Sequence, residues 1–151
     1  MLKQIEKLKV ENLDDTIEIG EAFAAEVEYP GGFTFPSFSA QWGPMLSTSI
    51  GEIFVVRSDD NRIVGLLGAA FAPDGFSGWL TALEQFWFIL PEYRSQGIAL
   101  QLFAAFEAEA RARGCKRILM VHLDGPLTKN LESLYHKFGY SSVEKTFAKT
   151  I

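Results

Sequence analysis

Residues 91–99 have the residue types of an anion site. They read Pro-Glu-Tyr-Arg-Ser-Gln-Gly-Ile-Ala and stand between a strand-forming run and an apolar helical pattern. The first turn of a helix has unpaired N–H groups and a partial positive charge, so it attracts anions. Gly97 has no Cβ and lets the backbone approach a phosphate closely, and the Arg94 guanidinium adds a charge-assisted contact. We therefore predict a diphosphate cradle in this segment.

The cradle differs from the two common phosphate motifs. It lacks the Lys-Ser/Thr pair of a P-loop and the three-glycine spacing of a dinucleotide-binding turn. Taken alone, Arg-x-x-Gly-x-Ala arises by chance in about one chain of this length in seven at ordinary residue usage. Its meaning therefore depends on a second segment, in which Asn130 is followed by Leu-Tyr-His-Lys-Phe-Gly-Tyr at residues 134–140.

Together these segments resemble the GNAT superfamily of acyl-CoA-dependent N-acyltransferases. The central motif of that family is a strand, a loop with Arg or Gln-x-x-Gly-x-Gly or Ala, and a helix, and residues 87–99 match it in register. The family's next motif is an Asn and then a helix ending in Leu-Tyr-x-x-x-Gly-Phe or Tyr, which is similar to Asn130 and residues 134–140. The approach to Asn130, residues 123–129, is longer than is usual in the family. The resemblance covers residues 81–147, and earlier residues agree only in the order of elements.

The resemblance implies that the chain binds acetyl-CoA. The N–H groups from Ser95 to Leu100 would hold the diphosphate, with Arg94 positioning the loop. The strand before them would pair with the pantetheine arm, and Asn130 would hydrogen-bond the cofactor or else only cap its helix. The cofactor-binding residues expected in this way are Trp87, Phe88, Ile89, Arg94, Ser95, Gln96, Gly97, Ile98, Ala99, Leu100 and Asn130.

Acyl transfer to an amine also needs a base, an acid and donors for the oxyanion. The attacking amine must be neutral, so a carboxylate or a chain of waters has to remove its proton. Glu84, on the same strand as the expected cofactor contacts, is the first candidate base, and His122 is the second. An exposed glutamate and a packed or surface histidine are the structural alternatives. The resemblance implies that Tyr135 protonates the leaving thiolate, and the alternative is a core aromatic one turn after Leu131.

An aromatic segment precedes these motifs. Residues 29–38 contain Pro and two Gly and are predicted to form a loop, and Phe33 and Phe35 are predicted to line the acceptor site or to pack on the core. Aromatic rings and a net charge of −5 favour a cationic, partly apolar amine. Trp42 and Trp79 are expected to be core or dimer contacts. The acceptor itself stays open among small amines, antibiotics, peptide N-termini and lysine side chains.

A mixed sheet has to position these groups. The expected fold class is α/β (α+β), with a mixed, mostly antiparallel central sheet flanked by helices, GNAT-like, in one domain of residues 1–151. Periodicity and turn residues predict the elements. The first half has a weak strand near residues 5–10, helices at 12–27 and 37–46, and strands at 52–57, 62–72 and 81–90. The two helices are predicted to be capped by Asn12 or Asp14 and by Ser37 or Ser39. The second half has a helix after Pro91 that ends at Gly114, a strand at 116–123, a helix from about Leu127 to Gly139 that buries Leu131, Leu134 and Phe138, and a closing strand at 140–147.

Composition excludes several classes. The chain has 151 residues, 48% of them hydrophobic and 13% aromatic, which suits one folded domain rather than a disordered chain. Its basic residues are scattered, which argues against a nucleic-acid partner. One cysteine, Cys115, and two histidines argue against a disulfide and a metal site, and Cys115 is expected to be an inert buried thiol. No apolar run is long enough to cross a membrane, so a cytoplasmic protein without a membrane partner is expected.

The predicted function is an N-acetyltransferase in which the amine attacks acetyl-CoA directly. No covalent enzyme intermediate is expected, because the one cysteine lacks a triad setting. Two alternatives stand beside it, a non-catalytic acyl-CoA-binding sensor or regulatory domain and an interaction module that uses its aromatic surface. The expected partner is a small-molecule or peptide amine, and a homodimer is left open.

Overall fold

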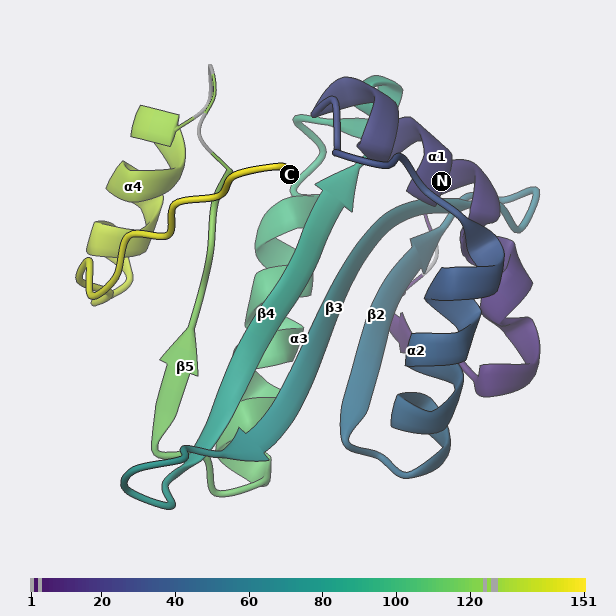
Figure 1. Ribbon diagram of the computed structural model, residues 1–151. Helices are drawn as coiled ribbons and strands as arrows, with labels where there is room; N and C mark the ends of the chain where they lie inside the picture. The colour runs from purple at the N-terminus through teal and green to yellow at the C-terminus, as the bar shows by residue number, and fades with distance from the viewer. Residues whose placement is uncertain (1, 3, 124, 126–127) are drawn as a thin grey trace. The chain divides into compact units, whose positions relative to one another are not determined.

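The chain folds around a five-stranded sheet, as the computed structural model in Figure 1 shows. The structure describes residues 2, 4–123, 125 and 128–151. Its contacts divide the chain into two units, Met1–Val121 and His122–Ile151, so a single domain over residues 1–151 stays a prediction. In chain order the elements are β1 (Glu6–Lys7), the 3₁₀ helix η1 (Val10–Thr16), α1 (Ile17–Glu26), α2 (Phe35–Ser47), β2 (Gly51–Arg57), β3 (Ile63–Pro73), β4 (Leu80–Ile89), the 3₁₀ helix η2 (Pro91–Tyr93), α3 (Ile98–Ala112), β5 (Arg117–Leu119) and α4 (Thr128–Lys137).

The sheet has the strand order β1-β2-β3-β4-β5. Strands β1 to β4 pair antiparallel, and β5 pairs parallel with β4. Short turns join β2 to β3 and β3 to β4, whereas η1, α1 and α2 lie between β1 and β2. Helix α3 supplies the crossover that the parallel pair of β4 and β5 requires. The prediction of a mixed, mostly antiparallel sheet flanked by helices is confirmed.

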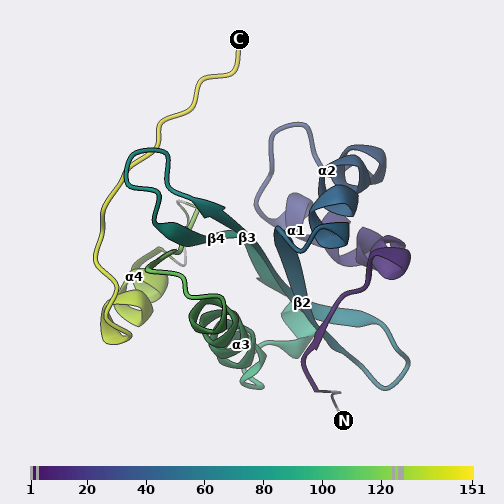
Figure 2. The ribbon, with the colours of Figure 1, turned by 90° about the horizontal axis from the view of Figure 1, so that it is seen from below.

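Helices cover both faces of the sheet. Figure 2 shows α3 on one side and α1 and α2 on the other. On the first face, Trp87 stacks on Phe103 of α3 with ring centroids 5.7 Å apart. On the opposite face, Phe88 meets Phe23 of α1 at 5.2 Å. Neighbouring residues of β4 thus point to opposite helix layers, as the alternation of a strand requires.

The core lies between these layers. Strands β2 and β3 are buried almost throughout, because helices cover both of their faces. The helical spacing of Ala99, Leu102, Phe103, Phe106 and Ala110 predicts that they form the buried face of α3. This is confirmed for all of them except Ala99, which is half buried, and Ile98 is buried in its place.

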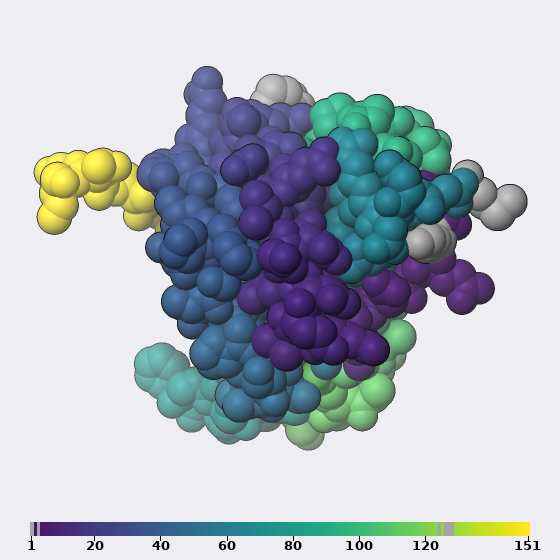
Figure 3. Space-filling model, turned by 90° about the vertical axis from the view of Figure 1, so that its right-hand side faces the viewer, coloured from purple at the N-terminus to yellow at the C-terminus, as the bar shows by residue number. Residues whose placement is uncertain are grey.

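Arginines fix the N-terminal segment to the β2–β3 hairpin. The Arg57 side chain is only 6% exposed and pairs with Glu6 at 2.7 Å and Asp15 at 2.8 Å. Arg62 pairs with Glu18 of α1 at 2.6 Å. In Figure 3, accordingly, the purple and blue N-terminal residues cover the face turned to the viewer, beside the hairpin.

The predicted helix caps are wrong. The first α-helix begins at Ile17, because η1 precedes it and supplies its first backbone acceptors. The second begins at Phe35, with Pro36 in its first turn, where a proline loses no helical hydrogen bond. Phe35 therefore opens α2 instead of lying in the loop.

The C-terminal unit differs most from expectation. The predicted strand at residues 140–147 is wrong, since residues 140–151 have no regular secondary structure. Its large apolar side chains Val143 and Phe147 are 62% and 82% exposed, so the segment has no buried face for a sheet to use. Phe138 is exposed because α4 ends at Lys137, and Tyr135 is buried in place of it. Leu131 and Leu134 are only half buried, and Leu127 lies outside the described residues.

No helix among the described residues is long and apolar enough to cross a membrane. The same residues contain no group of three or more His, Cys, Asp or Glu side chains that could hold a metal ion.

Candidate active site

A β-bulge interrupts β4 beside Glu84. Gly68 of β3 pairs with Phe86, whereas the next residue, Ala69, pairs with Glu84, so Gln85 is the extra residue. A bulge leaves a residue outside the regular ladder and is frequent next to active sites. The lack of a side chain at Gly68 also leaves room for the Phe86 ring, because a Cβ at Gly68 would lie 2.2 Å from a ring atom.

The Glu84 carboxyl is buried and only 4% of the residue is exposed. One oxygen, Oε2, accepts a hydrogen bond from the Val121 N–H at 3.1 Å. Burial raises the pKa of Glu84 to about 7, because the charged carboxylate loses its hydration, and the Val121 N–H offsets only part of that effect. Glu84 is therefore not the exposed strand glutamate of the structural alternative. Near neutral pH it can both take and release a proton.

Strands β4 and β5 separate after a short contact. Thr81, Ala82 and Leu83 pair with β5, which ends at Leu119, well short of the predicted residue 123. Figure 1 shows β4 continuing beyond that point. The described ladder between β4 and β5 thus ends at Leu83, and the outer edge of β4 continues beyond it. An extended ligand can pair with such an edge as an added strand.

The segment before α3 forms the expected opening. Ser95 and Gly97 have φ values of +67° and +77°. Left-handed residues in such a turn aim successive N–H groups into a concavity that binds anions. The first α3 bond runs from the Gln101 N–H to the Gly97 carbonyl at 3.2 Å, so the amides before it have no helical acceptor. A cavity of about 170 Å³ opens here, lined by Ile89, Tyr93, Arg94, Ser95, Gly97, Ile98, Ala99 and Leu100.

Arg94 is engaged by protein groups. Its Nε donates to the Ile89 carbonyl at 3.0 Å, and its Nη2 bonds Glu26 of α1 at 2.7 Å. The guanidinium also lies 5.2 Å from the centroid of the Phe88 ring. These contacts favour a positioning role over direct contact with a phosphate. Glu26 was not singled out in the sequence, because a partner 68 residues away leaves no local signal.

The aromatic residues form a cluster on the α2 side of β4. Phe33 lies 5.3 Å from Phe38, and Phe38 lies 5.8 Å from Phe86. Trp42 is a buried core residue, as expected, and its ring centroid lies 5.0 Å from that of Phe86. Sequence reasoning missed Phe38 and Phe86, although the alternation along β4 places Phe86 on this face. Half-buried Phe35 has no ring contact within this cluster.

Trp79 and Cys115 are both more exposed than the sequence predicts. Trp79 is 52% exposed and is therefore not a core residue. Cys115 is half buried, and burial raises the pKa of its thiol, which disfavours the reactive thiolate.

The second unit carries the other residues that the sequence predicts for the site. Tyr135 is 8% exposed, and its ring lies 5.9 Å from that of Tyr140. Asn130 lies exposed in the first turn of α4. His122 Nε2 is 3.4 Å from Glu132, and its buried Nδ1 has no hydrogen-bond partner among the described residues.

Solved structures share this fold. A ribosomal-protein-alanine N-acetyltransferase from Brucella melitensis biovar Abortus has a TM-score of 0.75 at 14% identity, covering 100% of this chain and 99% of that one. A predicted acetyltransferase from Clostridium acetobutylicum, solved with acetyl-CoA, has a TM-score of 0.80 at 15% identity, covering 99% and 96%. An aminoglycoside acetyltransferase from an uncultured soil metagenomic sample has a TM-score of 0.76 at 23% identity with the same coverage. At these identities the likeness shows the fold.

Sequence comparison adds the family. A curated relative, Acetyltransferase Atu2258 of Agrobacterium fabrum strain C58, is 36% identical over 90 residues, which are 58% of this chain and 57% of that protein. The chain thus matches a little over half of that relative's length. The model of the acetyltransferase (GNAT) family matches residues 21–140, from the middle of α1 to the tyrosine after α4. Since that span is most of the chain and includes both motifs, this protein belongs to the GNAT acetyltransferase family.

Proposed function

We propose that this chain is an N-acetyltransferase that moves the acetyl group of acetyl-CoA to an amine by direct attack. The observation that carries the proposal is the opening before α3. There Ser95 and Gly97 are left-handed, and the first-turn amides line a cavity. Only Gln101 Nε2, at 3.8 Å, lies near the position of a Cβ on Gly97, so no side chain crowds the backbone of the loop at this residue.

The part of β4 beyond its pairing with β5 supports the same cofactor. Backbone groups of Trp87 and Ile89 would pair with the amides of the pantetheine arm, with Phe88 between them. Ser95, Gln96, Ile98, Ala99 and Leu100 would offer N–H groups to the diphosphate. Arg94, held by Glu26 and the Ile89 carbonyl, would keep the loop in place. Asn130 would add a hydrogen bond to the cofactor.

Glu84 is the proposed base. It would take the proton of the ammonium group, directly or through water, and the amine nitrogen would then attack the thioester carbon. A C–N bond forms, and the C–S bond breaks as the oxyanion collapses. Backbone N–H groups at the bulge beside Gln85 are the donors available on β4 for that oxyanion. Glu84 is preferred to His122, because it is buried beside the bulge while His122 pairs with Glu132.

Tyr135 is the proposed acid. The leaving thiolate needs one proton, and the pKa of a phenol near 10 is close enough to that of a thiol for transfer. Tyr135 is nearly buried, which suits a group that acts in a site shielded from water. In the alternative, Tyr135 is a core aromatic, and loss of its hydroxyl would leave the rate of transfer unchanged.

The acceptor is proposed to be a cationic amine with an apolar body. Phe33 and Phe86 are half buried in the aromatic cluster and leave ring surface for such a body. The carboxylates of Glu18 and Glu26 on α1 are already paired with arginines, so they are poorly placed to bind a polycation. Phe35, the other predicted acceptor residue, stays a prediction, as do a cytoplasmic location and a homodimer.

One experiment separates this function from its alternatives. The chain is titrated with acetyl-CoA by calorimetry and then assayed with a panel of amines by release of free coenzyme A thiol. Binding with amine-dependent thiol release supports the transferase. Binding without release from any amine would favour an acyl-CoA sensor, and absence of binding would favour an interaction module.

A further inference from the structure

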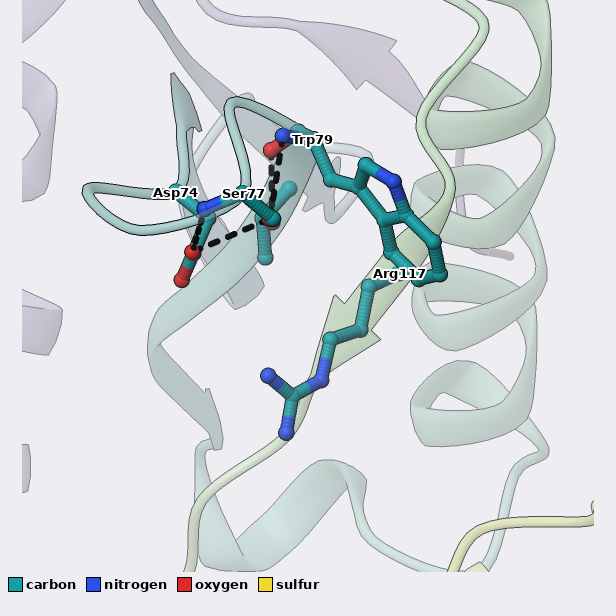
Figure 4. A pocket seen from close by; sticks show the side chains of 5 residues that line it. Asp74, Ser77, Trp79 and Arg117 are labelled. Atoms are coloured by element: carbon teal, nitrogen blue, oxygen red, sulfur yellow. Dashed lines mark hydrogen bonds between the residues drawn. The ribbon is translucent and has the colours of Figure 1, made fainter.

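A second cavity, of about 310 Å³, is shown in Figure 4. It lies at the start of β4, whereas the opening before α3 follows the end of that strand. The tip of the β3–β4 hairpin and the start of β5 form it, and it is lined by Asp74, Ser77, Trp79, Thr81 and Arg117. Since β4 has 10 residues, the two ends are separated by about 30 Å at the usual rise of a strand. This cavity is therefore distinct from the proposed cofactor and acceptor sites.

The hairpin tip is fixed by its own hydrogen bonds. Asp74 Oδ1 accepts from the Phe76 N–H at 3.0 Å, the Ser77 N–H at 2.8 Å and the Ser77 hydroxyl at 3.0 Å. The Trp79 N–H donates to Ser77 Oγ at 3.2 Å, and the Asp74 N–H donates to the Trp79 carbonyl at 2.8 Å. The cavity wall is thus organised before any ligand arrives, which lowers the entropy cost of binding.

Three chemically different groups face the cavity. The Trp79 indole is 52% exposed and offers a flat apolar surface, with Lys116 Nζ 6.0 Å from its centroid. Arg117 makes no side-chain hydrogen bond or ion pair with the residues that the structure describes, and its charge is one of the lesser causes that lower the pKa of Asp74. In Figure 4 its guanidinium extends away from the indole.

The third group is the Asp74 carboxylate. Hydrogen bonds from Ser77 and Phe76 lower the pKa of Asp74, so it is ionised at neutral pH. All three bonds end on Oδ1, and Oδ2 remains an acceptor for a ligand. The cavity therefore presents one negative group, one positive group and one ring.

We propose that this cavity binds a zwitterion with a flat apolar side chain, that is, an aromatic amino acid or a close analogue. Its carboxylate pairs with the Arg117 guanidinium, in a geometry that suits bidentate hydrogen bonds. Its ammonium group bonds Asp74 Oδ2, and its ring packs on the Trp79 indole. A phosphate dianion fits less well because Asp74 repels it, and a simple amine fits less well because Arg117 and Lys116 repel it. The proposal does not rest on the acetyltransferase function.

The test begins with three ligands and the whole chain, without acetyl-CoA. L-Phenylalanine has all three features, phenylpropionate lacks the ammonium group, and phenethylamine lacks the carboxylate. The indole N–H signal of Trp79 is followed by NMR and identified by its loss in Trp79→Phe. L-Phenylalanine should shift this signal saturably, and each truncated analogue should bind at least about tenfold more weakly, the usual effect of losing a charged hydrogen bond.

Matched variants complete the test. Arg117→Gln should weaken phenylalanine binding about 10- to 100-fold. Arg111→Gln, which changes an exposed arginine of α3 that does not line this cavity, should leave binding unchanged. Both variants should melt at the temperature of the parent and acetylate the best amine at the parental rate. No saturable shift at millimolar phenylalanine, equal weakening by both variants, or shifts confined to Phe33 and Phe38 would each overturn the proposal.

Discussion

A single buried carboxyl, Glu84, shows how position sets the chemistry of a side chain. On an exposed strand it would ionise with the pKa of an ordinary glutamate. On β4 it is 4% exposed, and loss of hydration raises its pKa to about 7. The sequence predicts its strand and its neighbours, but not its burial, because burial depends on segments distant in sequence such as Val121.

The pH dependence of the rate tests Glu84. A base acts only when deprotonated, so kcat/KM should rise as the pH passes through about 7 and level off above it. Glu84→Gln keeps the shape and can accept the Val121 N–H through its amide oxygen. It should lose that rising limb and lower the rate by about 10²–10⁴. Gln85→Glu, which places a carboxyl on the exposed neighbour, should leave the limb of the parent in place. An unchanged limb in Glu84→Gln would assign the proton transfer to water or to His122.

Tyr135→Phe tests the acid at the same scale. It removes one hydroxyl and keeps the ring that packs 5.9 Å from Tyr140. The affinity for acetyl-CoA should change little, while kcat falls about 10²–10⁴, because the proton is needed most in the transition state. Tyr140→Phe is the control, since it removes a hydroxyl from the adjacent ring. A normal kcat in Tyr135→Phe would leave Tyr135 as a core aromatic.

At the scale of elements, the sequence predicts best what local periodicity determines. Strands β2, β3 and β4 and helix α3 lie where alternation and helical spacing place them, because each buries a continuous apolar face. The caps predicted for α1 and α2 are wrong, since η1 leads directly into α1 and a proline stands in the first turn of α2. The prediction of a strand at residues 140–147 is wrong. A strand forms only beside a partner strand, and the sequence of a segment does not show whether such a partner is available.

The opening before α3 can be closed by one substitution. Gly97→Glu places a side chain and a negative charge at the first turn, so acetyl-CoA binding measured by calorimetry should be abolished. Gly97→Ala has the same backbone strain at φ +77° but no charge, and it should retain measurable binding. Both variants should stay folded, because the position is exposed at a helix start. Undiminished affinity for acetyl-CoA in folded Gly97→Glu would show that the diphosphate does not bind at this loop.

Strand β3 gives a test of packing. Gly68→Ala would bring a Cβ to 2.2 Å from the Phe86 ring, so the ring must move and the aromatic cluster with it. We expect a loss of about 1–3 kcal/mol in the free energy of unfolding, measured in urea. Gly43→Ala in α2 meets no atom within 4 Å and should instead be neutral or stabilising by up to about 1 kcal/mol. Equal stabilities for the two variants would mean that Phe86 moves without cost.

At the scale of the whole molecule, charge is the property that the sequence states directly. The net charge of −5 should attract cationic acceptors over distances near the Debye length. For the best cationic amine, kcat/KM should therefore fall by a few-fold between low and physiological salt. An amine that carries no charge beyond its reacting group should show a smaller change. A rate independent of salt, or a preference for acidic acceptors, would exclude long-range attraction.

The contact between Gly20 and Phe33 limits how this protein could be redesigned. Gly20 lies within α1, and a Cβ there would come within 2.6 Å of the Phe33 ring, so the ring occupies the space that the glycine leaves. The aromatic loop is thus seated on the helix before it and cannot be exchanged by itself. A loop transplanted from a relative with a different acceptor would need the matching residue at position 20. In this scaffold the unit of exchange is therefore the helix and the loop together.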